Sequence, residues 1–181
     1  MKVMLAIFLL LCPAALSAKG DDIVVSVCAQ RAWHYAVRGE FSVEISPDVV
    51  WRVLSDYENI PTFVRSVKES KLEKKNGNSR LLRQKFKEGF WWVARQMNVL
   101  LEIQETPRAA IEFTDILQED FNFYKGSWKI EEEARGARVV YDLEIGGNFS
   151  LPAFVTRSFL KRNARELLGQ VRREILARGG N

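Results

Sequence analysis

A single long helical pattern at the end of the chain, preceded by a series of short alternating segments, most constrains the fold. From Pro152 to about Ala177 apolar residues recur at helical spacing, whereas residues 67–145 largely alternate between apolar and polar side chains. A sheet with one apolar face needs a covering layer, and one long helix with an apolar stripe supplies it. The order of elements therefore predicts an α+β domain in which a curved antiparallel sheet of about seven strands wraps around the C-terminal helix.

Turn signals divide the alternating region into strands. Asn76-Gly77-Asn78 lies between two alternating runs and predicts a hairpin. Glu88-Gly89, Thr106-Pro107-Arg108 and Ala134-Arg135-Gly136 predict further turns. Two more segments, before residue 46, are rich in β-branched residues or alternate in the same way. The expected strands are residues 23–30, 37–45, 67–74, 81–87, 97–103, 110–115, 124–131 and 139–145.

A short helical insertion is expected between the second and third strands. Ser46-Pro47-Asp48 supplies an N-cap with proline at the first helical position, and Asn59-Ile60-Pro61 interrupts the helix that follows, so the insertion is bent. Residues 45–64, Ile-Ser-Pro-Asp-Val-Val-Trp-Arg-Val-Leu-Ser-Asp-Tyr-Glu-Asn-Ile-Pro-Thr-Phe-Val, resemble the opening motif of the polyketide cyclase/dehydrase family of the START-like (SRPBCC) helix-grip superfamily. The matching positions are Val50-Trp51, Leu54, Asp56-Tyr57, Pro61 and Phe63, with Gly126-Ser127-Trp128 and Leu151-Pro152 further along the chain.

The resemblance covers about residues 36–178, and Arg65 stands where the family commonly has a proline. It implies a helix-grip (START/Bet v 1-like) fold with an apolar cavity between sheet and C-terminal helix. We expect an N-terminal strand segment over residues 19–35 and the START-like ligand-binding domain over residues 36–178. Relatives by resemblance include coenzyme Q-binding START-type proteins as well as cyclases.

The alternation assigns an aromatic-rich set of side chains to the inward face of the sheet. From the helix, these side chains are expected to be faced by Phe154, Leu160, Ala164 and Leu167. These side chains either fill the core or line a site for a flat or lipid-like ligand. Phe90-Trp91-Trp92 falls at a predicted turn and is a lid, a membrane contact or the start of the next strand. The residues that we expect to line the ligand site are Trp51, Phe63, Phe86, Trp91, Trp92, Val99, Leu101, Phe113, Trp128, Tyr141, Phe154, Leu160 and Ala164.

Signals for catalysis are weak. His34 is the only histidine of the chain, so the sequence offers few residues that could form a catalytic triad or a histidine-based metal site. No Gly-rich phosphate loop occurs, so we expect no metal, no cofactor and no catalytic residue. The first hypothesis is a non-catalytic carrier of a lipid, an isoprenoid quinone or a polyketide-like aromatic. The alternative is an aromatase/cyclase-type enzyme that acts on a poly-keto chain in the same cavity and requires polar groups deep inside it.

The N-terminus predicts export. Lys2 is followed by an apolar run from Val3 to Cys12 and then by small residues, which is typical of a secretory signal peptide over residues 1–18. The run is too short to span a bilayer, which takes roughly 20 apolar residues. We therefore expect cleavage near Ala18 and a periplasmic or secreted protein.

The C-terminal helix is strongly basic. Residues 152–178 hold seven basic and two acidic residues, a net charge of +5. This face is either simply solvated or attracted to anionic lipid, so peripheral membrane contact through the basic helix is a hypothesis. Nucleic acid is not expected as a partner of an exported protein.

Overall fold

The computed structural model describes residues 23–180, except residues 32, 91–92 and 148–151, and of residues 88–90 and 93–95 it describes the backbone alone. The predicted signal peptide, residues 1–18, lies outside the described residues. Trp91 and Trp92 also lie outside them, so the structure does not test the predictions made for these two residues.

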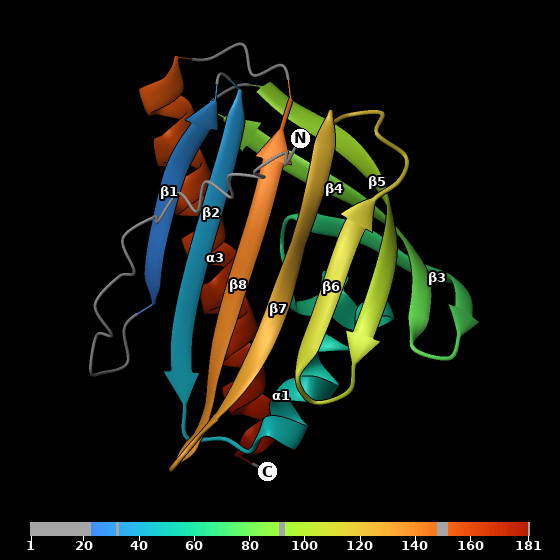
Figure 1. The fold of residues 1–181 in the computed structure, drawn as a ribbon, viewed down its shortest axis with the longest axis vertical. Helices are drawn as coiled ribbons and strands as arrows, with labels where there is room; N and C mark the ends of the chain where they lie inside the picture. Colours follow the sequence, from blue (N-terminus) through green and yellow to red (C-terminus); the bar gives the residue numbers. More distant parts are fainter. Residues whose placement is uncertain (1–22, 32, 91–92, 148–151, 181) are drawn as a thin grey trace, which may run out of the picture.

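Eight antiparallel strands form one sheet in the spatial order β1-β2-β8-β7-β6-β5-β4-β3 (Figure 1). The predicted α+β architecture of a curved sheet around a long C-terminal helix is confirmed. The strands are β1 Val24–Arg31, β2 His34–Val43, β3 Val67–Asn76, β4 Ser79–Phe90, β5 Val93–Thr106, β6 Ala110–Asp115, β7 Phe123–Glu133 and β8 Gly136–Gly146.

The long helix α3, Ala153–Gly179, lies along one face of the sheet, behind the strands in the view of Figure 1. The helix approaches the sheet closely at Gly39 of β2, where an added Cβ atom would lie 2.3 Å from Cδ1 of Leu168. A glycine at this position therefore lets the helix sit directly on the sheet. The side chains of α3 that are buried are Thr156, Leu160, Ala164, Leu168, Gln170, Val171 and Ile175.

The bent insertion consists of three short pieces: α1 Pro47–Leu54, the 3₁₀ turn η1 Tyr57–Asn59 and α2 Ile60–Phe63. Proline begins α1, as the sequence indicated, and Pro61 lies in the first turn of α2. In Figure 1, α1 lies near the C-terminal end of α3. Val50 and Val53 of α1 are fully buried, so the insertion closes this end of the core.

The hairpins were predicted with one error. The Asn-Gly hairpin is present, because β3 ends at Asn76, β4 begins at Ser79, and Gly77 between them has a φ of +53°. The turn predicted at Glu88-Gly89 is wrong, because β4 continues to Phe90 and Gly89 pairs with Ala94 of β5. Pairing with a long neighbouring strand supplies the backbone hydrogen bonds that outweigh the low strand propensity of glycine.

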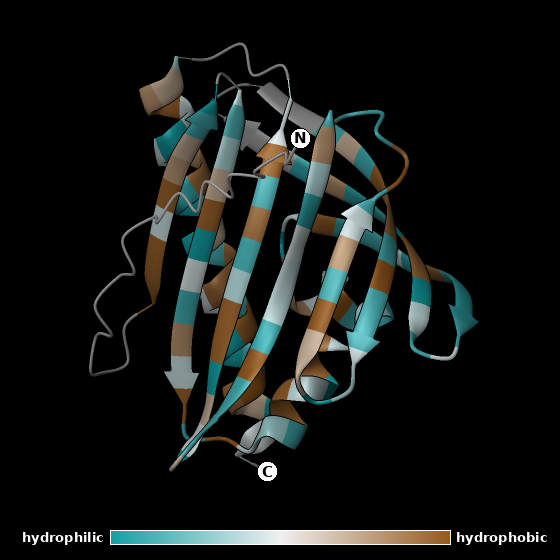
Figure 2. Ribbon diagram, in the orientation of Figure 1, coloured by the Kyte–Doolittle hydropathy of each residue, from teal (hydrophilic) through white to brown (hydrophobic). Residues whose placement is uncertain are grey.

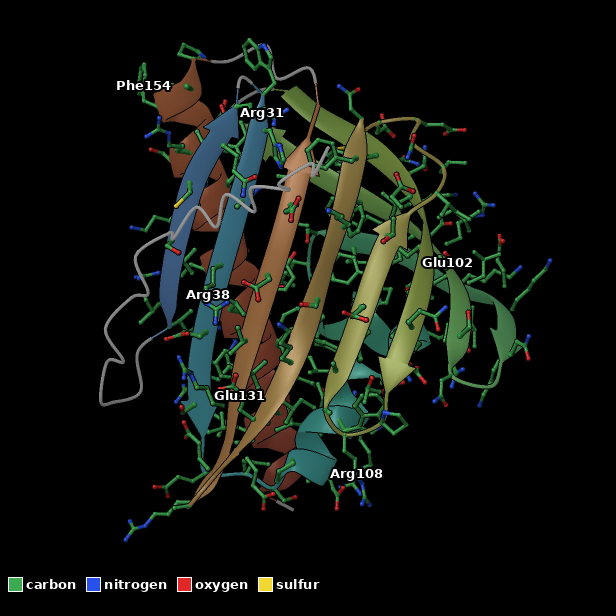
Figure 3. The ribbon with its side chains drawn as sticks, in the orientation of Figure 1. Arg31, Arg38, Glu102, Arg108, Glu131 and Phe154 are labelled. Atoms are coloured by element: carbon green, nitrogen blue, oxygen red, sulfur yellow. The ribbon has the colours of Figure 1, made fainter. Side chains whose placement is uncertain are left out.

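The outer face of the sheet is polar and ion-paired. Figure 2 shows polar and apolar residues alternating along the strands, and Arg38 and Glu131 project from this face in Figure 3. Arg38 bonds both carboxylate oxygens of Asp142, at 2.9 and 3.1 Å. Because these charges lie opposite the face that α3 covers, the apolar interior lies between the sheet and the helices.

Candidate ligand-binding cavity

Two apolar cavities lie between the sheet and the helices. The first, of about 100 Å³, lies between the sheet and the bent insertion, and we call it the inner chamber. The second, of about 160 Å³, lies between the sheet and α3, and we call it the middle chamber. They adjoin, because six residues line both: Val64, Val67, Phe86, Tyr124, Tyr141 and Leu167.

An aromatic wall lines these chambers. Trp128 of β7 and Tyr141 of β8 are direct cross-strand partners, and their ring centroids are 4.5 Å apart. Phe113 lies 5.7 Å from Tyr124 and 6.5 Å from Tyr141, and Phe86 lies 6.3 Å from Tyr124. Such rings present large, rigid apolar surfaces, which suit a flat or chain-like apolar molecule.

The polar groups of the inner chamber are already engaged within the protein. The hydroxyl of Tyr57 donates a hydrogen bond of 2.7 Å to Glu105, whose other oxygen lies 2.7 Å from the guanidinium of Arg80. Burial, together with this hydrogen bond and the charge of Glu105, raises the pKa of Tyr57 far above its ordinary value. The amide of Gln84 donates to the hydroxyl of Ser70 at 3.0 Å.

Tyr141 is the most deeply buried hydroxyl of the aromatic wall. Burial raises the pKa of Tyr141 well above its ordinary value, and the neighbouring Tyr124, which is hydrogen-bonded to it, acts in the same direction. Burial therefore favours the neutral phenol of Tyr141, and its hydrogen bond with Tyr124 engages the hydroxyl within the protein.

A third cavity adjoins the middle chamber close to the surface. This outer chamber, of about 160 Å³, is polar and lies between α3, residues 65–66 just before β3, and Lys87 of β4. It shares Ser66, Asn163 and Leu167 with the middle chamber. Among the described residues, Leu167 alone lines all three chambers, so its half-buried side chain stands at the junction.

An ion pair ties the C-terminal end of α3 to the bent insertion. Arg178 donates 2.7 and 2.6 Å hydrogen bonds to Asp56 and Glu174, and its guanidinium lies 5.8 Å from the ring centre of Phe63. Burial acts to raise the pKa of Asp56, but hydrogen bonds from Arg178 and Asn59 outweigh it, so the pKa lies below its ordinary value. Asp56 thus holds the insertion against α3 beside the inner chamber.

Seven of the predicted site residues line the inner or middle chamber. Val99, although predicted to line the site, is fully buried in the core and borders no chamber. Trp51 and Phe63 are half-buried on the insertion and pack against the core instead. The seven that line a chamber are Phe86, Leu101, Phe113, Trp128, Tyr141, Leu160 and Ala164.

The inward placement of Phe154 is wrong. Its side chain is 72% exposed and lies at the N-terminal end of α3, as Figure 3 shows. The buried stripe of α3 passes instead through Thr156, one helical turn before Leu160. Phe154 is therefore directed away from the sheet.

The predicted lining residues did not include Tyr124 or Tyr57, which both line the inner chamber. Tyr124 lies four residues before Trp128, so the alternation along β7 already places both on one face. Tyr57 belongs to the opening motif, but its position in the inner chamber depends on how the insertion packs on β4 and β5. No local pattern reports that packing.

A shallow trough of about 790 Å³ on the outer face of the sheet is larger than any of these chambers. Charged side chains dominate it, and several pair with each other, such as Arg138 with Glu40 at 2.6 Å and Lys125 with Glu144 at 3.3 Å. Among the described residues that line it, Phe113 is the one aromatic residue, so it has no cluster of rings like the aromatic wall. We therefore assign the candidate site to the interior chambers.

A curved antiparallel sheet wrapped around a C-terminal helix, with an apolar cavity between them, defines a helix-grip protein of the START/Bet v 1-like type. The family model described as polyketide cyclase / dehydrase and lipid transport matches residues 43–172. The chain therefore belongs to this family, as its opening motif indicated.

Solved structures share the fold at low sequence identity. A STAR-related lipid transfer protein from Xanthomonas axonopodis has a TM-score of 0.73 and 17% identity, covering 89% of this chain and 97% of its own. The Zhui aromatase/cyclase from Streptomyces sp. R1128 has a TM-score of 0.65 and 14% identity, covering 80% and 95%. A START superfamily protein from Mycobacterium smegmatis has a TM-score of 0.63 and 15% identity, covering 80% and 97%. No curated protein matches this sequence.

Proposed function

We propose that this protein is an exported, non-catalytic carrier that binds a hydrophobic small molecule in the inner and middle chambers. The observation that carries this proposal is the composition of the inner chamber. Its wall is aromatic and aliphatic, and its polar side chains Tyr57, Gln84, Tyr124 and Tyr141 are each engaged by another protein group. A site of this kind gains affinity from apolar burial.

The volume of the chambers limits the size of the ligand that they can hold. Drug-sized ligand pockets measure roughly 300–1,000 Å³, whereas the inner and middle chambers measure about 100 and 160 Å³. A single apolar chain or a small aromatic ring system fits this space better than a two-chain lipid.

The alternative, an aromatase/cyclase-type enzyme, has less support. Such chemistry needs an acid or base that reaches the substrate inside the cavity. Glu105 is the buried carboxylate beside the inner chamber, and both of its oxygens are taken by Tyr57 and Arg80. This arrangement favours binding without turnover.

Ligand exchange is proposed to occur at an anionic membrane surface. The N-terminal half of α3 exposes Phe154 together with Arg157 and Lys161, while Arg178 at the other end is occupied by Asp56 and Glu174. No ion pair of Arg157 or Lys161 is seen among the described residues, and an exposed aromatic ring beside such cations suits the interface of an anionic bilayer. Among the residues that the structure describes, no helix is long and apolar enough to cross a membrane.

Export is tested by sequencing the N-terminus of protein recovered outside the cytoplasm. We expect it to begin near Lys19, and recovery with Met1 intact would refute the signal-peptide prediction.

Binding is tested with N-phenyl-1-naphthylamine, a neutral apolar dye that brightens in apolar surroundings. The exported protein should increase dye emission, and the dye should quench tryptophan emission. In a Trp128→Phe variant the dye should still brighten while part of the quenching is lost, because Trp128 lines the inner chamber. If the parent protein leaves dye emission unchanged, the carrier function is excluded.

A further inference from the structure

The outer chamber differs in chemistry from the two chambers that it adjoins. It is lined by Arg65, Ser66, Lys87, Asn163, Glu166, Leu167 and Gln170, of which only Leu167 is apolar. The middle chamber, by contrast, is bordered largely by aliphatic and aromatic side chains. A molecule that passes Leu167 therefore has one part in apolar surroundings and one part in polar surroundings.

The charges of the outer chamber favour an anion. Arg65 and Lys87 are exposed, and among the described residues neither side chain forms an ion pair. The ammonium of Lys68 lies nearby, 2.6 Å from the backbone carbonyl of Arg65. The single carboxylate, Glu166 on α3, accepts a hydrogen bond of 3.1 Å from the amide of Gln170.

We propose that the ligand is a single-chain amphiphile with a carboxylate-type head, which lies in the outer chamber between Arg65 and Lys87, while its apolar part passes Leu167 into the middle chamber. This inference rests on the proposed carrier function. The orientation follows from desolvation, because an isolated charge is too costly to bury in the aromatic interior, whereas the outer chamber is polar and lined by exposed side chains. Apolar burial supplies most of the affinity, and the two cations select the head.

Competition between decanoate or decanol and N-phenyl-1-naphthylamine tests the proposal, because the two competitors share a chain and differ in the charge of the head. The parent is compared with the double variant Arg65→Gln/Lys87→Gln. The control is Lys71→Gln/Lys75→Gln, which changes the net charge equally at exposed positions of β3 outside the outer chamber. We expect Arg65→Gln/Lys87→Gln to lower the affinity for decanoate about tenfold, which is an effect that the loss of two partly screened ion pairs would allow.

Decanol binding should be unchanged in both variants, and the control should bind decanoate like the parent. Raising the salt concentration should lower the affinity for decanoate more in the parent than in the double variant. The proposal of an anionic head is refuted if the double variant changes the affinities for decanol and decanoate equally, or if the control lowers the affinity for decanoate as much as the double variant does. The carrier function stands in either case. If the parent binds neither the dye nor the two competitors, the carrier function fails and this inference fails with it.

Discussion

The backbone N–H of Arg65 donates a hydrogen bond of 2.7 Å to Oε1 of Gln170, a side chain 105 residues further along the chain. Arg65 follows the bent insertion and Gln170 lies in α3, so this bond joins the two elements that border the cavity. A proline at this position would lack the N–H and could not form the bond. The backbone N–H of Arg65 thus contributes a bond between insertion and helix.

Replacing Gln170 tests the importance of this bond. Gln170→Leu leaves the N–H of Arg65 without its acceptor and should lower the free energy of unfolding by about 1–2 kcal/mol. Arg65→Ala is the matched control, because it keeps the N–H and removes only an exposed side chain. Denaturant unfolding measures both, and equal midpoints for the two variants would show that the bond contributes nothing.

The ion pair between Asp56 and Arg178 predicts a pH dependence. Because the pKa of folded Asp56 lies below the 3.8 of an ordinary aspartate, its stabilisation is present above about pH 4 and is lost as the pH falls through the folded pKa. Asp56→Asn should therefore cost about 1 kcal/mol at pH 7 and progressively less as the pH falls through the folded pKa of Asp56, below which the parent also lacks the charge. Unfolding curves across this range check the prediction.

Glu58 supplies the control for this experiment. It is an exposed carboxylate on the same insertion, two residues from Asp56, and no ion pair involving it is seen among the described residues. Glu58→Gln should leave the pH dependence of the parent intact. A cost for Asp56→Asn that stays constant from pH 7 to pH 2 contradicts the assignment.

Filling the middle chamber should separate binding from folding. Ala164 is buried on α3 and lines this chamber, so Ala164→Phe places a ring where the ligand is expected. If the space is open, the unfolding free energy should change by less than about 1 kcal/mol, whereas a packed core would lose roughly 1–3 kcal/mol. Dye binding should be abolished in Ala164→Phe and retained in Ala177→Phe, an exposed position of the same helix. A destabilised variant that still binds the dye argues against this location of the site.

The exposed end of α3 should determine membrane binding. The triple variant Phe154→Ser/Arg157→Gln/Lys161→Gln should lose most co-sedimentation with anionic phospholipid vesicles at low salt, without a change in unfolding. Arg173→Gln, at an exposed position in the other half of α3, should behave like the parent. A parent protein that does not sediment with the vesicles at low salt would rule out the membrane hypothesis.

Local patterns were sufficient for most of the fold. The alternation around Asn76-Gly77 and the helical stripe through Leu160 and Leu168 depend on neighbours within a few residues, so the sequence reports them directly. The turn predicted at Glu88-Gly89 was wrong, because pairing with β5 overrides the local propensity of these residues. The same reasoning placed Phe86, Trp128 and Tyr141 on the inward face, where they border the chambers.

The sequence by itself determined which face of each strand and helix is apolar, and with it the family and the architecture. Only the tertiary structure decided which inward side chains border empty space and which, like Val99, are packed. It also decided that Leu167 stands at the junction of three chambers and that the hydroxyl of Tyr57 is held by Glu105. These relationships depend on the position of α3 and the insertion over the sheet, which is set by contacts between residues far apart in the chain and leaves no periodic signal.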